Sequence, residues 1–338
     1  MNLNALMEKW SEREFVPIFN LYIYPTYDCT RNCPNCYSSK QGMTTGVMSD
    51  ETLTKLCSWS ERLFKNIDPK LGFSVMLGGE PLEHPHIFSR YFEHIKSKMK
   101  KHRTIVFSNL DPIYGISYKH FMNMDYLFFN ISNIDFKECD IRLKVMDAKA
   151  PKTTVNLTAT MFESNLDRAE DIVKYAIKHK FRMVKLYTDS YSVNNPDYIK
   201  RLKNKIHKCL DIIEEQDVKF PLSHFFDNMI PEWDTIEDNP FLCGRYMASV
   251  RVDGSIGSCM RDIETAIGHI DTTEPTLKNI HHEDILRRLE EKCSYCEVNK
   301  ICYGGCQYNN ASKNNLCDLY QEILPRIRSL VPKRITKL

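Results

Sequence analysis

The sequence predicts a protein of the α/β class in which parallel strands are joined by helices. Short apolar segments typical of buried strands alternate with amphipathic segments of helical period over residues 19–190. Such alternation is typical of β-α units with right-handed crossovers, whose active sites lie at the carboxyl ends of the strands. With 338 residues, of which 42% are apolar and 27% charged, the chain is long enough for about two globular domains.

Six strands and the helices between them are predicted from this pattern. Ser49 is the expected N-cap of the first long helix, because Asp50 and Glu51 follow it in the first turn. The expected strands are 19–24, 72–77, 104–108, 126–132, 153–160 and 182–188. The expected helices of this region are 50–67, 87–99, 137–149, 166–180 and 194–215.

Composition divides the chain into two domains and their connections. The prolines Pro221, Pro231 and Pro240, with acidic residues between the last two, indicate a joint between domains. The expected units are an N-terminal helix at 1–18, a first domain at 19–190, a bridging helix and linker at 191–240, a cysteine-rich domain at 241–330 and a tail at 331–338.

The cysteine-rich domain is expected to begin with a β-hairpin. Residues 247–252 and 255–260 have strand character and flank Asp253-Gly254, a dipeptide that favours a tight hairpin turn. Helices are expected near 283–291 and 316–330, on either side of the last cysteines.

Charge and hydropathy exclude several classes of function. The chain carries 46 basic and 44 acidic residues, a net charge of +2, without the Lys/Arg stripe that nucleic-acid binding requires. The N-terminal segment lacks the apolar core of a signal peptide, and no stretch reaches the ~20 apolar residues of a spanning helix. We therefore expect a cytoplasmic protein that binds neither nucleic acid nor membrane. Thirteen cysteines in such a protein indicate metal or redox chemistry more than structural disulfides.

Three cysteines stand at spacing C-x3-C-x2-C directly after the first predicted strand. Cys29, Cys33 and Cys36 lie in one tight loop, and three thiolates so placed can hold three irons of a cubane cluster and leave the fourth iron open. Two alternatives remain for this spacing alone. A zinc site would need a fourth ligand close by, and a disulfide would leave one thiol over.

Most of the predicted strands present polar side chains on one face. The opposite face, which includes Val75, Ile105 and Phe107, is apolar and is expected beneath the helices. Polar groups on several strands that share one interior imply a wet or ligand-filled space, although an open, half-exposed sheet would explain any single strand. The polar residues are Tyr22, Tyr24, Ser74, Ser108, Asn130, Ser132, Asn156, Thr158, Thr160, Lys185 and Tyr187.

A second group of cysteines occupies the predicted C-terminal domain. Both zinc and iron-sulfur ligation are open on spacing alone, because C-x2-C is also a common zinc half-site. In either case the domain would be stabilised by metal, since its apolar content is low. The seven cysteines are Cys243, Cys259, Cys293, Cys296, Cys302, Cys306 and Cys317.

These motifs together resemble the radical SAM superfamily, in its branch with a C-terminal SPASM domain. The resemblance rests on the first three cysteines, on Gly78-Gly79-Glu80-Pro81 after the second strand, and on the seven downstream cysteines, with Gly254 four residues before the second of them (Gly254-x4-Cys259). It covers the chain from about residue 19 to residue 330. It implies a partial (β/α)6 barrel at 19–190, followed by a small SPASM domain that binds auxiliary iron-sulfur clusters.

The resemblance also assigns roles to residues of the first domain. Cys29, Cys33 and Cys36 would hold a 4Fe-4S cluster whose open iron binds the amino and carboxylate groups of S-adenosylmethionine (SAM). Gly78, Gly79, Glu80 and Pro81 would receive the amino group, Ser132 would lie near the ribose and Arg142 near the carboxylate. Asn35 stands where the family usually has an aromatic residue that contacts adenine, and Tyr37 or Tyr24 would replace it.

In the SPASM domain the resemblance implies one or two auxiliary iron-sulfur clusters. Cys243, Cys259 and Cys306 would bind the first, which leaves either an open iron or a ligand other than cysteine. Cys293, Cys296, Cys302 and Cys317 would bind the second.

The expected activity is reductive cleavage of SAM to a 5′-deoxyadenosyl radical that abstracts a hydrogen atom from a peptide or protein side chain, giving an oxidised or cross-linked product. A flavodoxin- or ferredoxin-type reductant is implied. Because only 18 residues precede the first predicted strand, a peptide substrate would be recognised directly or through a separate leader-peptide-binding protein. Asp189 and Tyr187, at the end of the last strand of the domain, are the candidates for a base or substrate anchor, unless Asp189 only caps the strand end.

Three alternatives stand beside this function. One is oxidation of a small-molecule alcohol, such as a sugar or an aminoglycoside-like compound. Another is peptide epimerisation, with Cys57 or Cys209 as hydrogen donor if either faced the interior, although both are expected on apolar helix faces. The third is a protein without enzymatic activity, either an iron-sulfur electron carrier or a zinc-stapled binding protein.

Overall fold

The computed structural model of the chain describes residues 15–17, 20–40, 42–43, 45–65, 73–76, 78–98, 102–218, 247–257, 260, 266–273, 276–278, 296–297 and 313–330, and the fold is that of these residues. Its centre is a sheet in which six consecutive strands run parallel and are hydrogen-bonded in chain order. The six are β2 (Asn20–Ile23), β3 (Phe73–Met76), β4 (Arg103–Ser108), β5 (Tyr126–Asn130), β6 (Thr154–Met161) and β7 (Val184–Thr188). All six predicted strands are therefore confirmed.

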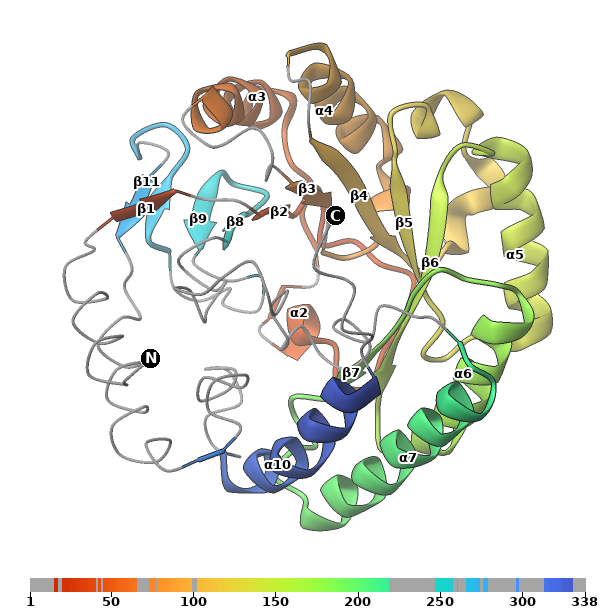
Figure 1. The fold of residues 1–338 in the computed structure, drawn as a ribbon. Helices are drawn as coiled ribbons and strands as arrows, with labels where there is room; N and C mark the ends of the chain where they lie inside the picture. The colour runs from red at the N-terminus through yellow and green to blue at the C-terminus, as the bar shows by residue number, and fades with distance from the viewer. Residues whose placement is uncertain are drawn as a thin grey trace.

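Helices cover one side of this sheet, and Figure 1 shows them around its outer side. The predicted cap of α3 is confirmed, because Ser49 Oγ accepts a hydrogen bond of 3.0 Å from the Thr52 N–H. Asn195 caps α7 in the same way, because its Oδ1 accepts a hydrogen bond of 3.0 Å from the Asp197 N–H. The main helices are α3 (Asp50–Lys65), α4 (Pro85–Lys98), α5 (Phe136–Lys149), α6 (Ala169–Lys178), α7 (Pro196–Glu215) and α10 (Lys313–Leu330).

Short helical segments complete the connections. They are α2 (Tyr37–Lys40), η1 (Pro81–Glu83), η2 (Asp111–Gly115), η3 (Tyr118–Phe121) and η4 (Leu166–Arg168).

The sheet has a helix-covered face and an opposite face, called the inner face below. The predicted faces are confirmed for β2, β5, β6 and β7, where Leu21, Leu127, Leu157 and Leu186 are fully buried in the core beneath the helices. In β4 the prediction was wrong. Val106 lies in the helix-side core, while Ile105 and Phe107 pack with Tyr24 on the inner face.

The reason for this error lies in the composition of β4. Both of its faces carry apolar residues, so alternation shows which residues share a face but not which face meets the helices. β3 also departs from the prediction, because Met76, which belongs to the same alternation as Ser74, is buried in the helix-side core.

The predicted C-terminal hairpin is confirmed and is continuous with the main sheet. Strands β8 (Met247–Val250) and β9 (Ser255–Gly257) pair antiparallel across the Asp253-Gly254 turn, where Gly254 has φ +89°. Strand β8 also pairs in parallel with β2, so the expected cysteine-rich domain begins by extending the sheet of the first domain. The sheet order is β10-β9-β8-β2-β3-β4-β5-β6-β7, with β10 at Gly268–His269.

The N-terminal region departs from the expected helix. Residues Phe15–Pro17, the end of that predicted element, form strand β1, which pairs antiparallel with β11 (Thr276–Lys278). The two strands lie side by side at the edge of Figure 1. This pairing joins segments far apart in the chain, and a local helical pattern cannot reveal it. The helix expected over residues 1–14 lies outside the described residues.

The last helix closes the described fold. The helix predicted at 316–330 is confirmed as α10, which packs on α7. Between the two helices, the Arg326 guanidinium donates a hydrogen bond of 3.1 Å to the His207 carbonyl. In the described parts of the chain, no helix is long and apolar enough to cross a membrane. The linker at 219–240, the helix expected near 283–291 and the tail at 331–338 lie outside them.

Candidate functional site

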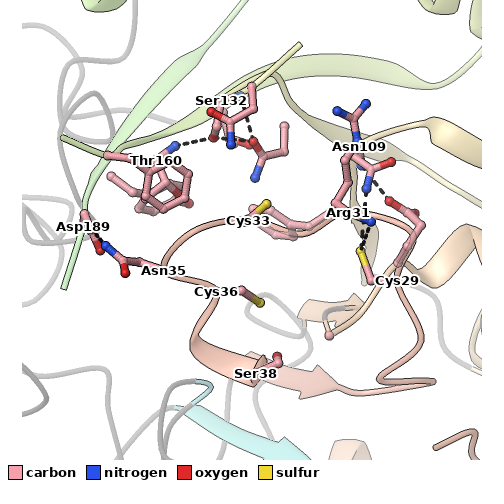
Figure 2. Close-up of a pocket in the computed structure, with 18 of the residues that line it drawn as sticks. Cys29, Arg31, Cys33, Asn35, Cys36, Ser38, Asn109, Ser132, Thr160 and Asp189 are labelled. Carbon is pink, nitrogen blue, oxygen red and sulfur yellow. Dashed lines mark hydrogen bonds between the residues drawn. The ribbon is translucent and has the colours of Figure 1, made fainter. Parts of the chain in front are cut away.

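A cavity of about 280 Å³ opens on the inner face at the carboxyl ends of the strands. The loop that carries Cys29, Cys33 and Cys36, called the cysteine loop below, forms one wall, and the Gly78-Gly79-Glu80 turn lies beside it. The ends of β4 to β7 supply the other walls (Figure 2). Among the polar residues that alternation predicted for this interior, Tyr22, Ser108, Asn130, Ser132, Thr158, Thr160, Lys185 and Tyr187 line the cavity.

The three thiols of the cysteine loop border the same space (Figure 2). All three are free, so the disulfide alternative has no support in the described structure. Burial raises the pKa of the Cys29 thiol to about 11 and also raises the pKa of Cys33. The Cys29 thiol would be neutral near pH 7, and metal binding would displace its proton.

The arrangement of the thiols bears on the kind of metal they suit. Among the described residues, no three histidine, cysteine, aspartate or glutamate side chains are gathered closely enough to hold a single metal ion. A cubane cluster instead takes its thiolates on separate irons. Three thiols that border one space are therefore a donor set that a cubane cluster with one open iron can use.

The two glycines of the Gly-Gly-Glu-Pro turn allow it to pack against the cysteine loop. Gly78 has φ +84° and Gly79 has φ +41°, in the left-handed region that favours glycine. A Cβ on Gly78 would lie 2.0 Å from Tyr24 Cδ1, and one on Gly79 would lie 2.2 Å from the Asp28 carbonyl oxygen. The Glu80 N–H donates a hydrogen bond of 2.7 Å to that same oxygen. The turn and the cysteine loop are thus directly joined.

Glu80 is buried and holds this corner of the cavity together. Its carboxylate accepts hydrogen bonds from the Ser108 hydroxyl at 2.7 Å, from the Asn109 N–H at 2.8 Å and from the Leu82 N–H at 3.0 Å. Burial nevertheless raises its pKa to about 7. The Glu80 carboxylate therefore connects the Gly-Gly turn to the end of β4, and the side chain also borders the cavity.

One end of the cysteine loop is held by an ionic network. The Arg31 guanidinium donates both to Asp111 Oδ1 and to Asp111 Oδ2, and the Arg142 guanidinium also donates to Asp111. Arg142 is buried and is not among the residues that line the cavity. Its guanidinium donates hydrogen bonds of 2.8 Å to the Glu138 carboxylate and of 2.7 Å to the Asn109 carbonyl. Arg31 does line it.

The other end of the loop is tied to the end of β7. Asn35 Nδ2 donates a hydrogen bond of 2.5 Å to Asp189 Oδ2, as Figure 2 shows on the opposite side of the cavity from Arg31. The Ser192 hydroxyl donates a hydrogen bond of 2.5 Å to the same oxygen. The Tyr191 N–H donates a hydrogen bond of 3.2 Å to Asp189 Oδ1. Asp189 thus caps the turn after its strand and also anchors the cysteine loop.

The sequence reasoning missed these two anchors. The sequence analysis assigned no role to Arg31 or Asp111, although an arginine between two cysteines and an acid three residues after β4 were available as signals. It treated Asn35 only as a departure from a family pattern, while the structure gives it a partner 154 residues away.

The predicted ribose contact, Ser132, lies on the cavity wall and is buried. Its hydroxyl donates a hydrogen bond of 2.6 Å to Asn130 Oδ1 and accepts one of 2.7 Å from the Thr160 N–H. Tyr187 also lines the cavity, near Asp189. Of the two tyrosines named as adenine contacts, Tyr24 is buried and its hydroxyl donates to the Met260 carbonyl.

The cysteines outside the loop divide into two groups. Cys139 and Cys209 are fully buried in helices, and Cys57 packs against the core, so all three are core thiols and none lines the cavity. Cys296 and Cys317 are half-buried. Gln321, one helical turn after Cys317 on α10, donates a hydrogen bond of 3.5 Å to Cys296 Sγ. Two predicted auxiliary-cluster ligands therefore lie in the same region. Cys243, Cys259, Cys293, Cys302 and Cys306 lie outside the described residues.

Comparison with known proteins shows which solved structures have a similar fold. No family model matches the sequence, and no curated protein matches it. The chain is similar to the solved structure of anSMEcpe, an anaerobic sulfatase-maturating enzyme, with bound AdoMet and Cp18Cys peptide, with a TM-score of 0.70 and 15% identity over 93% of this chain and 99% of that one. It is also similar to Streptococcus suis SuiB bound to precursor peptide SuiA, with a TM-score of 0.59 and 16% identity over 91% of this chain and 75% of that one.

Both of these proteins are radical SAM enzymes. At such low identity the similarity establishes the fold alone. The resemblance drawn from the sequence motifs is thus confirmed at that level, because the chain has the fold of radical SAM enzymes.

The Asp111 network gives a first prediction. Asp111→Asn should lower the free energy of unfolding at pH 7 by about 1–3 kcal/mol, because two guanidinium groups lose a charged partner. Burial opposes ionisation of Asp111, but the Arg31 and Arg142 hydrogen bonds outweigh it and lower its pKa. The stabilisation is therefore present above the unfolded pKa of about 3.9 and is lost as the pH falls through the lower folded value.

Denaturant unfolding of both proteins between pH 3 and pH 7 measures this difference. Asp50→Asn is the matched control, because Asp50 also pairs with an arginine but its side chain is 78% exposed, and little change is expected. An equal effect of the two substitutions would contradict the proposed role of the network.

Gly79 gives a second prediction. Gly79→Ala should push the Gly-Gly turn away from the cysteine loop, since the added Cβ would meet the Asp28 carbonyl oxygen at 2.2 Å. We expect the variant to retain much less iron than the wild type after anaerobic reconstitution, as measured by iron analysis and visible absorbance. Gly115→Ala is the control, because a Cβ there meets no atom within 4 Å. Normal iron retention by Gly79→Ala would show that the close approach is not needed.

Proposed function

We propose that this chain is a radical SAM enzyme that acts on a peptide or protein side chain, and that its curved sheet is the partial (β/α)6 barrel of that family. The observation that carries the proposal is the meeting of three free thiols, a left-handed Gly-Gly turn and polar strand ends at one cavity. The fold shared with anSMEcpe and SuiB, both solved with peptides, supports it.

In this proposal Cys29, Cys33 and Cys36 hold a 4Fe-4S cluster. The donor set fits, because three thiols border one space and none is committed to a disulfide. When bound, the reduced cluster and SAM supply a 5′-deoxyadenosyl radical that takes a hydrogen atom from the substrate. The chain positions these groups and excludes water from the cavity.

The described residues have distinct parts in this arrangement. The Gly78-Gly79 turn borders the cavity beside the thiols, and Ser132 lines the same cavity. Arg31, which lines the cavity, is the better placed arginine to meet a carboxylate, and Arg142 is a positioning residue that acts through Asp111. Asp189 positions the cysteine loop, and Tyr187 is the candidate to contact the substrate.

The downstream cysteines have a proposed part in removing the electron that remains on the substrate after hydrogen abstraction. Hydrogen abstraction leaves one unpaired electron on the substrate, and a closed-shell oxidised product forms when that electron and a proton leave. We propose that auxiliary clusters held by Cys293, Cys296, Cys302 and Cys317, and by Cys243, Cys259 and Cys306, accept the electron and return it to a flavodoxin- or ferredoxin-type protein. A separate leader-binding protein would then deliver a peptide substrate.

The epimerisation alternative loses its structural basis. It required Cys57 or Cys209 to face the interior, and both pack in helices on the other side of the sheet. Cys209 is fully buried there.

The experiment is anaerobic reconstitution with iron and sulfide, followed by incubation with SAM and dithionite. The wild type should form 5′-deoxyadenosine, measured by chromatography and mass spectrometry. The triple variant Cys29→Ala, Cys33→Ala, Cys36→Ala should form none and should lose about four irons per chain. Cys57→Ala is the control and should match the wild type, because Cys57 is a core thiol away from the cavity.

The same preparations test the auxiliary clusters. Cys293→Ala with Cys296→Ala should lose iron that is additional to the loss in the triple variant. Absence of 5′-deoxyadenosine from a fully iron-loaded wild type would exclude the proposed activity, and unchanged iron in both variants would exclude the ligand assignment.

A further inference from the structure

One side chain of the cavity wall directs a hydrogen-bond donor at the cysteine loop. Asn109 is the first residue after β4 and lines the cavity. Its Nδ2 lies 3.9 Å from Cys29 Sγ, within reach of a hydrogen bond to sulfur, which is a larger atom than oxygen. The Arg31 N–H donates a second hydrogen bond of 3.4 Å to the same sulfur. Figure 2 shows both residues beside Cys29, so this thiol has two N–H donors.

The orientation of the Asn109 amide is fixed by a neighbouring backbone group. The Asp111 N–H donates a hydrogen bond of 2.7 Å to Asn109 Oδ1. A backbone N–H can only donate, so the amide oxygen must occupy this position and the amide nitrogen the other. Rotation of the amide by 180° would bring two donors against each other. The turn after β4 therefore determines that Asn109 presents its N–H donors to Cys29.

The backbone of Asn109 is held on both sides. Its N–H donates a hydrogen bond of 2.8 Å to Glu80 Oε2, and its carbonyl accepts one of 2.7 Å from Arg142. The next residue, Leu110, is buried and has φ +61°, in the left-handed region that a residue other than glycine rarely adopts. Such a conformation persists only where the surrounding structure holds it in place. The position of the Asn109 side chain is thus built into the fold.

A donor at a ligating sulfur changes the reduction potential of an iron-sulfur cluster. The N–H dipole stabilises the negative charge that one-electron reduction adds to the cluster and its thiolates, so it raises the potential. A thiolate is a stronger acceptor than a thiol, and the contact from Asn109 therefore gains strength when Cys29 is deprotonated to bind iron. Because the amide is uncharged, it acts without altering the net charge of the site.

We propose that Asn109 is a positioning residue whose side-chain amide donates to the Cys29 thiolate and thereby raises the reduction potential of the loop cluster. This inference rests on the proposed function and gives a role to a residue outside the cysteine motif and the Gly-Gly-Glu-Pro turn. The step that it favours is the transfer of one electron from the flavodoxin- or ferredoxin-type reductant, which is oxidised as the cluster is reduced.

An anaerobic redox titration of the reconstituted protein with titanium(III) citrate, without SAM and followed by EPR, tests the proposal. The signal of the loop cluster is the one that the triple variant Cys29→Ala, Cys33→Ala, Cys36→Ala lacks, so its identification does not depend on SAM cleavage. In Asn109→Ser the hydroxyl can accept the Asp111 N–H but is too short to reach the thiol. At the wild-type midpoint, the ratio of reduced to oxidised cluster should fall about tenfold in this variant, a shift of about 59 mV to lower potential for one electron.

Two further variants make the result specific to the Asn109 amide. Asn133→Ser is the matched control, because Asn133 is an exposed asparagine of the same cavity whose Oδ1 accepts a hydrogen bond of 3.3 Å from Asn165. It should leave the midpoint potential unchanged. Asn109→Asp keeps the size of the side chain and the acceptor for the Asp111 N–H, and it decides the question if the serine variant retains no iron. It should lower the potential further than serine, since it removes the donor and adds a negative charge.

The sign of the shift separates this role from a change in solvent access. A midpoint potential in the Asn109 variants equal to that of the wild type, or above it as the entry of water would produce, would overturn the proposal. An assay of 5′-deoxyadenosine on the same preparations keeps the two proposals apart. A lowered potential in a protein that forms no 5′-deoxyadenosine would support the role of Asn109 and remove the radical SAM activity. Formation of 5′-deoxyadenosine with an unchanged potential would have the opposite meaning.

Discussion

The rest of the site depends on one backbone contact, the 2.7 Å hydrogen bond from the Glu80 N–H to the Asp28 carbonyl. It joins the turn after β3 to the cysteine loop after β2, and it is possible only because Gly79 has no Cβ. Glu80 extends the connection to β4 through Ser108 and Asn109. Three neighbouring strands are thereby fixed to one another at the end where the cavity opens.

The distribution of charge in the cavity follows from this frame. Glu80 and Asp189 accept hydrogen bonds from the strand end and the loop around the cavity, and Asp111 pairs with Arg31, which also lines it. The mouth of the cavity is therefore built from groups that hold one another in place before a ligand binds.

Much of the fold could be predicted from the sequence, because it is encoded by local periodicity and caps. All six parallel strands, the Ser49 cap and the Asp253-Gly254 hairpin are of this kind. What could not be predicted depends on partners distant in the chain: the pairing of β1 with β11, the pairing of β8 with β2, and the side of β4 that meets the helices. The same holds within the site. The cysteines and the Gly-Gly turn were recognisable as motifs, whereas the contacts of Arg31 and Asn35 with Asp111 and Asp189 exist only after folding.

The two anchors of the cysteine loop have a consequence for how distant substitutions would act. Arg31 and Asn35 hold the loop by hydrogen bonds to side chains that follow β4 and β7. Contacts within the polypeptide therefore contribute to the placement of the thiols. A substitution at Asp111 or Asp189 would disturb the cysteine loop from a part of the chain that carries no thiol.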